Sequence, residues 1–160
     1  MFKEIKATDI KENIVDLLKN NWGLVTAGDS EKYNMMTVSW GAMGELWGKD
    51  SVTVYIRPQR YTEEFMNAFD HFTLSFFSLD KKQAVHGICG SKSGRDIIKP
   101  MLAALHLILT RQHHTLKRQS LFLFVKKWLR VSLTLRNLLT ILLRINGIPK
   151  RIFIIFILQR

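Results

Sequence analysis

The sequence predicts a mostly β fold, an antiparallel barrel or sandwich with short helices between its strands. Apolar and polar residues alternate in short β-prone segments, most clearly in Ser51–Ile56 (S-V-T-V-Y-I). Turns rich in Gly, Asn and Pro separate these segments. Strand and helix signals do not alternate regularly, which argues against a parallel sheet. With 160 residues, 47% of them hydrophobic, the chain is long enough for one domain with its own core.

The elements are expected in the following order. Asp9 is placed to cap a helix whose apolar residues recur at helical spacing as far as Gly23. The strands are predicted at Leu24–Ala27, Met35–Trp40, Ser51–Ile56 and His71–Phe77, with a bend or hairpin at Gly41–Gly48. Thr62 and Asp80 are each expected to cap a short helix, the second of which ends at Gly90.

The charge distribution divides the chain into two parts. Residues 1–96 hold all 13 Asp and Glu and 12 of the 24 Lys and Arg, whereas residues 97–160 hold the other 12 Lys and Arg and no acid. Beyond Pro100 the apolar residues follow no clean period. Lys126–Leu143 fits a cationic amphipathic helix of the kind that lies on membranes, and the alternative is sequence that was never selected to fold.

The compartment is expected to be the cytoplasm. The single cysteine, Cys89, excludes an internal disulfide and fits a reducing environment. The N-terminal residues do not have the pattern of a signal peptide. The sequence also has no run of 18 apolar residues that would form an ordinary membrane-spanning helix.

Two segments have the composition of anion-binding sites. Arg57–Thr62 (R-P-Q-R-Y-T) follows the clearest strand and opens a helix, so two guanidinium groups lie beside a helix N-terminus. Ser91–Asp96 (S-K-S-G-R-D) adds hydroxyls, cations and a glycine that lets the backbone approach a ligand. Taken alone, Arg57–Thr62 also fits a solvated surface turn, and the presence of the second segment makes that alternative less favoured. Met36–Trp40 offers hydroxyls and backbone groups along a strand edge, although by itself it is ordinary strand sequence.

No catalytic side chain and no metal site is predicted. His71 and His86 lack the spacing of metal ligands, and Cys89 is expected to be a packed residue rather than a nucleophile.

Four segments together resemble the flavin reductase-like family, in its flavoredoxin-like branch. They are N-M-M-T-V-S-W-G (34–41), V-Y-I-R-P-Q-R-Y-T (54–62), T-L-S-F-F (73–77) and C-G-S-K-S-G-R-D-I-I-K (89–99). Members of this family bind FMN in a split β-barrel. The resemblance implies that FMN is held by Asn34, Met36, Thr37, Val38, Ser39, Trp40, Arg57, Arg60, Tyr61, Thr62, Ser91, Lys92, Ser93 and Arg95. One departure is Ile98, where the family usually has an acid.

The resemblance implies an FMN oxidoreductase that passes electrons from NAD(P)H or another reduced donor, and a homodimer. The flavin supplies the chemistry, so the protein needs no catalytic acid or nucleophile of its own. Two alternatives remain open. The chain can be an FMN-binding electron carrier without a substrate, or its basic C-terminal part can be an extension that binds membranes or nucleic acid. Whether the chain is an enzyme is not decided by the sequence.

Our hypothesis for the unusual composition after residue 99 is a frame error. Back-translation of residues 100–160 with permissive codons, read two bases on, gives ANAGCTSPYFDKTAPYFEEAEFIFVCKK and, near the end, NQWYPEKDFHHFYFAE. Both strings restore acids and resemble the C-terminal half of the family. We therefore expect residues 1–99 to be an incomplete split-barrel domain and residues 100–160 an aberrant, helical or disordered tail. Poor solubility and weak or absent FMN binding would follow.

Overall fold

The computed structural model describes residues 5–29, 31–46, 48–96, 121–134 and 151–157, and confirms a mostly β fold with short helices. The strands are β1 (Gly23–Gly28), β2 (Tyr33–Val38), β3 (Gly41–Leu46), β4 (Lys49–Ile56), β5 (His71–Phe76), β6 (Leu121–Thr134) and β7 (Arg151–Ile157). The α-helices are α1 (Ile14–Asp16), α2 (Tyr61–Ala68) and α3 (Lys82–Cys89). Single turns of other helix types are η1 (Ala7–Asp9), η2 (Leu17–Asn21) and η3 (Leu79–Lys81).

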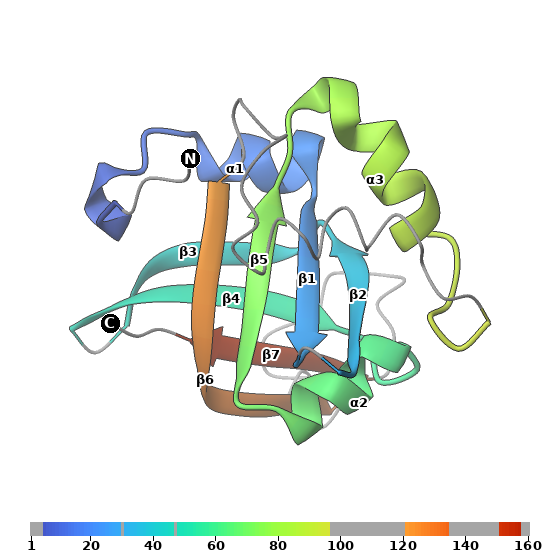
Figure 1. Ribbon diagram of the computed structural model, residues 1–160. Coiled ribbons are helices and arrows are strands. Elements are labelled where there is room, and N and C mark those ends of the chain that lie inside the picture. The colour runs from blue at the N-terminus through green and yellow to red at the C-terminus, as the bar shows by residue number, and fades with distance from the viewer. Residues whose placement is uncertain (1–4, 30, 47, 97–120, 135–150, 158–160) are drawn as a thin grey trace.

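The strands form one antiparallel sheet of seven strands in the order β2-β1-β5-β6-β7-β4-β3. Strand β6 is the link between its two halves. The first part of β6 pairs with β5, and its last part pairs with β7 after a register shift between Lys127 and Leu129. Because a bulge bends the strand, the two halves cross one another, as Figure 1 shows.

The main hydrophobic core fills the space between these two halves. Val25 of β1, Val54 of β4 and Leu74 of β5 have no exposed surface, and Phe65 and Met66 of α2 close one end of the core. These strand residues face inward because side chains alternate along each strand. The alternation in Ser51–Ile56 therefore predicted the buried face of β4 correctly.

A second, smaller core lies between α3 and the other face of β1 and β2. Leu24 and Met35 come from the strands, and Val85 and Cys89 come from the helix, which places Val85 and Cys89 on the face of α3 that covers the sheet. Cys89 is buried here, as expected for a packed residue. Helix α3 thus lies directly against strand β2 (Figure 1).

Three expected helix starts are wrong. Asp80 does not cap the helix before Gly90, because it lies inside the turn η3, and Lys81 is at the N-cap of α3. The N-terminal helix is capped by Asn13, whose Oδ1 accepts from the amides of Val15 and Asp16, and η1 precedes it as a separate turn. Helix α2 begins one residue before Thr62, with Arg60 at the N-cap. Thr62 does not cap this helix because its hydroxyl accepts a hydrogen bond from another element, as described below.

Part of the C-terminal segment is strand rather than helix. Residues 126–134, expected within an amphipathic helix, belong to β6, and the rest of the Lys126–Leu143 prediction lies outside the described residues. Strands β6 and β7 lie between β5 and β4 in the sheet. A segment rich in Leu, Phe and Val satisfies its backbone groups when it pairs with β5 and β4.

Candidate binding site along the edge of strand β2

Strand β2 is one of the two end strands of the sheet, and among the described residues no strand covers its outer edge. It pairs with β1, from Gly23 opposite Val38 to Gly28 opposite Tyr33. Its other edge therefore presents N–H and C=O groups to a ligand. Helix α2 lies at one end of β2, and the loop of residues 90–96 follows α3 on the same side (Figure 1). We call the outer edge of β2, together with α2 and this loop, the β2-edge site.

Asn34 and Thr62 join strand β2 to helix α2. Asn34 Nδ2 donates to Thr62 Oγ1 at 2.8 Å, and the two side chains are 5% and 1% exposed. A buried side-chain hydrogen bond of this kind is costly to break, because it would leave two polar groups without partners. The bond therefore fixes the start of α2 relative to the edge of β2.

Arg57 and Arg60 bring two positive charges to the N-terminus of α2. They are the ends of a turn in which the Arg60 amide donates to the Arg57 carbonyl at 3.0 Å. Burial, and then the charge of Arg57, lowers the pKa of Arg60. The buried Arg60 Nε has no hydrogen-bond partner, and neither arginine forms an ion pair within the described part of the chain. Two half-buried cations without a counter-ion favour an anion.

The loop after α3 lies against the same two elements. A Cβ on Gly94 would lie 2.0 Å from Asn34 Oδ1 and 3.3 Å from a ring carbon of Tyr61, so the backbone passes where no other residue fits. Arg95 pairs with Glu64, and its guanidinium carbon lies 4.5 Å from the centre of the Tyr61 ring. The guanidinium of Arg95 therefore fastens the loop to α2.

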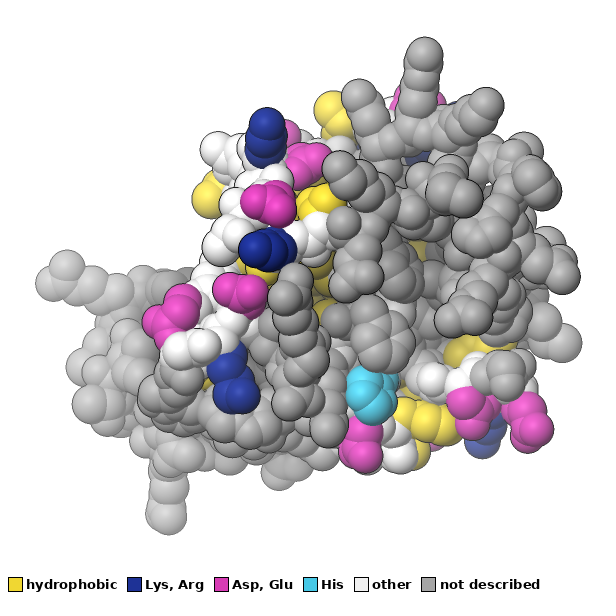
Figure 2. Space-filling model, turned by 60° about the vertical axis from the view of Figure 1, so that its left-hand side comes forward, with side chains coloured by type: hydrophobic (Ala, Val, Ile, Leu, Met, Phe, Trp, Pro, Cys, Tyr) yellow, Lys and Arg dark blue, Asp and Glu magenta, His cyan; other side chains and the backbone are white. Residues whose placement is uncertain are grey.

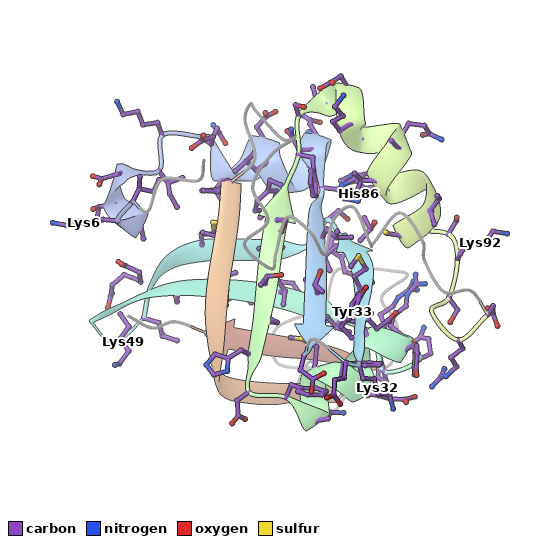
Figure 3. All side chains as sticks on the ribbon, viewed as in Figure 1. Lys6, Lys32, Tyr33, Lys49, His86 and Lys92 are labelled. Carbon is purple, nitrogen blue, oxygen red and sulfur yellow. The ribbon has the colours of Figure 1, made fainter. Side chains whose placement is uncertain are left out.

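The remaining candidate residues differ in the direction of their side chains, which point into the core, toward α3 or into solvent. Met36 and Val38 point into the main core, so at these positions β2 offers its backbone rather than its side chains. Thr37 points to the opposite face, toward α3. Ser39 and Trp40 are exposed beyond the end of β2, and Ser91 and Lys92 are exposed in the loop, whereas Ser93 is half-buried. Figure 3 shows Lys92 pointing away from the rest of the molecule.

Sequence analysis missed Glu64 and His86. Glu64 lies one turn after Tyr61 on α2, and this spacing lets both residues contact Arg95. His86 lies three residues before the buried Cys89 on α3, a spacing that puts both on one helix face. Helical spacing in the two short helices was therefore the available signal for both residues.

On one face, the described surface does not separate its charges by sign. In Figure 2 the coloured Lys/Arg and Asp/Glu side chains lie next to one another on the face shown. Among the described residues, no helix is long and apolar enough to cross a membrane. The same residues contain no cluster of three or more His, Cys, Asp or Glu that would hold a metal ion.

This geometry is the split-barrel fold of flavoredoxins and of FMN-binding flavin reductase-like proteins. A flavoredoxin from Methanosarcina acetivorans is similar over 98% of this chain and 72% of its own, with 14% identity and a TM-score of 0.56. An FMN-binding domain of a flavin reductase-like enzyme from Shewanella baltica is similar over 89% of this chain and 69% of its own (17% identity, TM-score 0.53). An FMN-binding protein from Thermus thermophilus, solved with p-hydroxybenzaldehyde, is similar over 98% of this chain and 78% of its own (15% identity, TM-score 0.56).

At these identities the likeness establishes the fold. No protein-family model and no curated protein matches the sequence.

Proposed function

We propose that this chain is an FMN-binding flavoprotein and that the β2-edge site holds the cofactor. The unusual C-terminal part led us to expect weak binding, but every residue of this site lies before residue 97. One observation carries the proposal most directly: Arg57 and Arg60 lie together at the N-terminus of α2, and no described residue forms an ion pair with either of them. Inorganic or organic phosphate is the anion that such an arrangement suits best. The solved structures that share the fold include proteins whose descriptions name FMN.

The residues present fit FMN in three respects. Arg57 and Arg60 would hold the phosphate. The outer edge of β2, which no strand covers in the described part of the chain, would offer backbone donors and acceptors to the polar rim of the flavin. The loop from Gly90 to Asp96, held by Arg95 on α2, would close over the cofactor. When bound, FMN supplies hydride and electron transfer, and the protein binds and orients it.

Fourteen residues were predicted from the resemblance to hold FMN, and we propose that the side chains of only some of them contact it directly. Arg95 is engaged by Glu64 and Tyr61, so its role is to position the loop rather than to bind phosphate. Met36 and Val38 would contribute through their main chain, because their side chains lie in the core.

We further propose that the protein is a cytoplasmic flavin reductase that takes electrons from NAD(P)H. The family resemblance of the four segments supports this step. The flavin carries the electrons, so the β2-edge site needs no acid or base of its own. The residues that carry the resemblance lie within residues 1–99, whose net charge is zero (13 Lys and Arg against 13 Asp and Glu). That balance does not favour a nucleic-acid partner.

A homodimer is the assembly we propose. Trp40 is 52% exposed just beyond β2, where a second copy would cover it near the cofactor. One chain has a mass of 18.6 kDa, and light scattering after size-exclusion chromatography should give twice that mass. A monomer with bound FMN would remove the dimer from the proposal and leave the cofactor site intact.

The function is tested in two stages. The purified chain is first mixed with FMN and passed through a desalting column, and retained flavin is measured by its visible spectrum. NADH or NADPH is then added to the loaded protein under anaerobic conditions. Retention of FMN followed by bleaching of the flavin supports a reductase. Retention without bleaching by either nucleotide supports an electron carrier, and no retention under any loading condition contradicts both.

A further inference from the structure

His86 is a buried histidine on the face of α3 that covers β2 (Figure 3). Its side chain is 4% exposed, and Nε2 has no hydrogen-bond partner of normal geometry among the described residues. Burial, together with the charge of Lys82 one turn earlier, lowers the pKa of His86 to about 4, although the backbone of Trp22 opposes this shift in part. The imidazole is therefore neutral near pH 7.

The neutral ring is joined to strand β2 by one hydrogen bond. Nδ1 of His86 lies 2.8 Å from Oγ1 of Thr37. A neutral imidazole has one donor and one acceptor nitrogen. The backbone of Trp22 acts as a hydrogen-bond partner that raises the pKa of His86, and Nδ1 already lies against Thr37, so we assign the proton to Nε2, and Nδ1 then accepts from the Thr37 hydroxyl. The direction of that hydroxyl is thus set by His86.

The main chain of His86 also fixes the start of the closing loop. Its carbonyl accepts from the Gly90 amide at 2.9 Å. A Cβ on Gly90 would lie 2.8 Å from the His86 carbonyl oxygen and 3.3 Å from Thr37 Oγ1. The loop therefore begins directly against Thr37, and with Gly94 against Asn34 it contacts β2 at two positions.

Two aromatic rings, those of Trp22 and Phe77, contact the ring of His86. Their rings meet it edge-on, with centroids 5.8 Å and 6.4 Å away. Trp22 has φ 64° and ψ 149°, a conformation that residues other than glycine rarely adopt. Lys82 Nζ lies 3.6 Å from the indole centre and donates to the Asn20 carbonyl at 2.6 Å. Strained residues that are held by such contacts cluster at functional sites.

We propose that His86 is a positioning residue for the β2-edge site. It fixes the distance between Thr37 of β2 and Gly90 of the closing loop. The proposal rests on the proposed function, because it assigns His86 an effect on FMN. His86 acts through Thr37 and the loop, and does not touch the cofactor. A merely structural histidine would stabilise the fold without changing how the bound flavin behaves.

A double-mutant cycle tests this coupling in the full chain. His86→Phe keeps an aromatic ring against Trp22 and Phe77 but removes Nδ1, and Thr37→Val removes the hydroxyl at constant shape. FMN dissociation constants are measured by fluorescence titration for the unaltered chain, H86F, T37V and the double variant. The reduction potential of bound FMN is measured for the same four proteins.

Each single substitution should raise the dissociation constant by about three- to tenfold, the worth of one hydrogen bond. The double variant should bind no more weakly than either single variant, because both remove the same interaction. H86F should shift the flavin potential, and should produce no further shift when T37V is already present. His86→Asn, whose amide can meet Thr37 at the position of Nδ1, should restore affinity to within about twofold.

Three outcomes separate the possibilities. If the unaltered chain does not bind FMN, the proposed function fails and this inference fails with it. If FMN binds and H86F leaves both affinity and potential unchanged, the inference alone is overturned. It is also overturned if the effects of H86F and T37V add, because His86 would then act independently of Thr37. Unfolding of the four apoproteins in urea shows whether a change in affinity merely follows a loss of stability.

Discussion

At the scale of single residues, the buried polar groups differ in whether they have a hydrogen-bond partner. Asn34 and Thr62 satisfy one another, and Thr37 and His86 do the same across a helix and a strand. Arg60 Nε is buried without a partner among the described residues. A group of this kind is expected either to cost stability or to await a ligand. Thr26, Thr73 and Nε2 of His86 are also buried without a partner there, but of these four groups only Arg60 carries a charge at neutral pH and lies beside Arg57 at the start of α2, and we therefore propose Arg60 as the ligand-binding residue.

Substitution of Arg60 should therefore weaken phosphate binding selectively. Arg60→Gln is expected to raise the FMN dissociation constant by about tenfold or more, because a hydrogen bond to a charged group is lost. Riboflavin, which lacks the phosphate, should bind the variant as it binds the unaltered chain. Lys49→Gln removes an exposed charge on the far side of the molecule from Lys92 (Figure 3) and serves as the control. An equal loss for FMN and riboflavin would assign Arg60 to folding instead.

His86 should make the protein less stable in acid. Its pKa is lowered from 6.5 to about 4 by burial and by Lys82. The unfolded chain therefore takes up a proton at this site between pH 6.5 and pH 4 while the folded chain does not. The free energy of unfolding should fall through that window and the contribution of His86 should level off below it, with a total on the order of 3 kcal/mol.

Urea unfolding at several pH values checks this dependence. His86→Phe should flatten the curve between pH 6.5 and pH 4 relative to the unaltered chain. His71→Gln is the matched control, because His71 is an exposed histidine on β5. Should H71Q remove the slope and H86F preserve it, the buried histidine would not be its source.

At the scale of elements, strands were more predictable than helices. The alternation in Ser51–Ile56 and the β-prone residues of His71–Phe77 reported the pleat of β4 and β5 directly. The short helices were harder. Asn13 caps the first one through a local hydrogen bond where Asp9 was expected, and Arg60 is at the N-cap of α2 while the expected cap, Thr62, bonds to Asn34 of β2. Pairing of β6 with β5 could not be foreseen either, because a long-range partner makes a strand from sequence without a clear period.

The candidate site shows the same limit. Sequence pattern identified Arg57, Arg60 and the loop as anion-binding candidates. It did not reveal that Arg95 is occupied by Glu64, because residues 31 positions apart become neighbours only in the fold. It also gave no role to His86, whose partner Thr37 lies 49 positions earlier.

The closing loop should tolerate no side chain at Gly94. In Gly94→Ala a Cβ would lie 2.0 Å from Asn34 Oδ1, so the loop must move away from β2. We expect FMN to bind about five- to hundredfold more weakly, in line with the usual cost of overpacking. Gly44→Ala on β3 is the control, because its Cβ would have no neighbour within 4 Å. Fluorescence titration measures both, and equal affinities for the two variants would contradict the role of the loop.

At the scale of the whole molecule, the C-terminal segment is the unusual part. Strands β6 and β7 complete the sheet, yet the stretch from residue 97 to residue 160 contains no Asp or Glu. We propose that a frame error near the codon for Lys99 produced this composition. The structure accounts for how such a segment can pair with β5 and β4, since backbone hydrogen bonds do not depend on side-chain identity.

The frame proposal predicts a one-base difference near the codons for Lys99–Met101 between this gene and independent isolates. A chain made with the alternative frame after Lys99 should be more soluble and should bind FMN more tightly than the chain described here, because acids return to an apolar, basic segment. Sequencing of isolates and parallel titration of the two chains check both statements. An intact frame in every isolate would overturn the proposal.

The most direct test of the central claim is an isothermal titration of the chain with FMN and, separately, with riboflavin. The β2-edge site predicts saturable binding of one FMN per chain, with riboflavin bound at least about tenfold more weakly because it cannot use Arg57 and Arg60. Equal affinity for the two flavins would contradict the phosphate site. No heat of binding, together with no quenching of flavin fluorescence, would contradict the proposal as a whole.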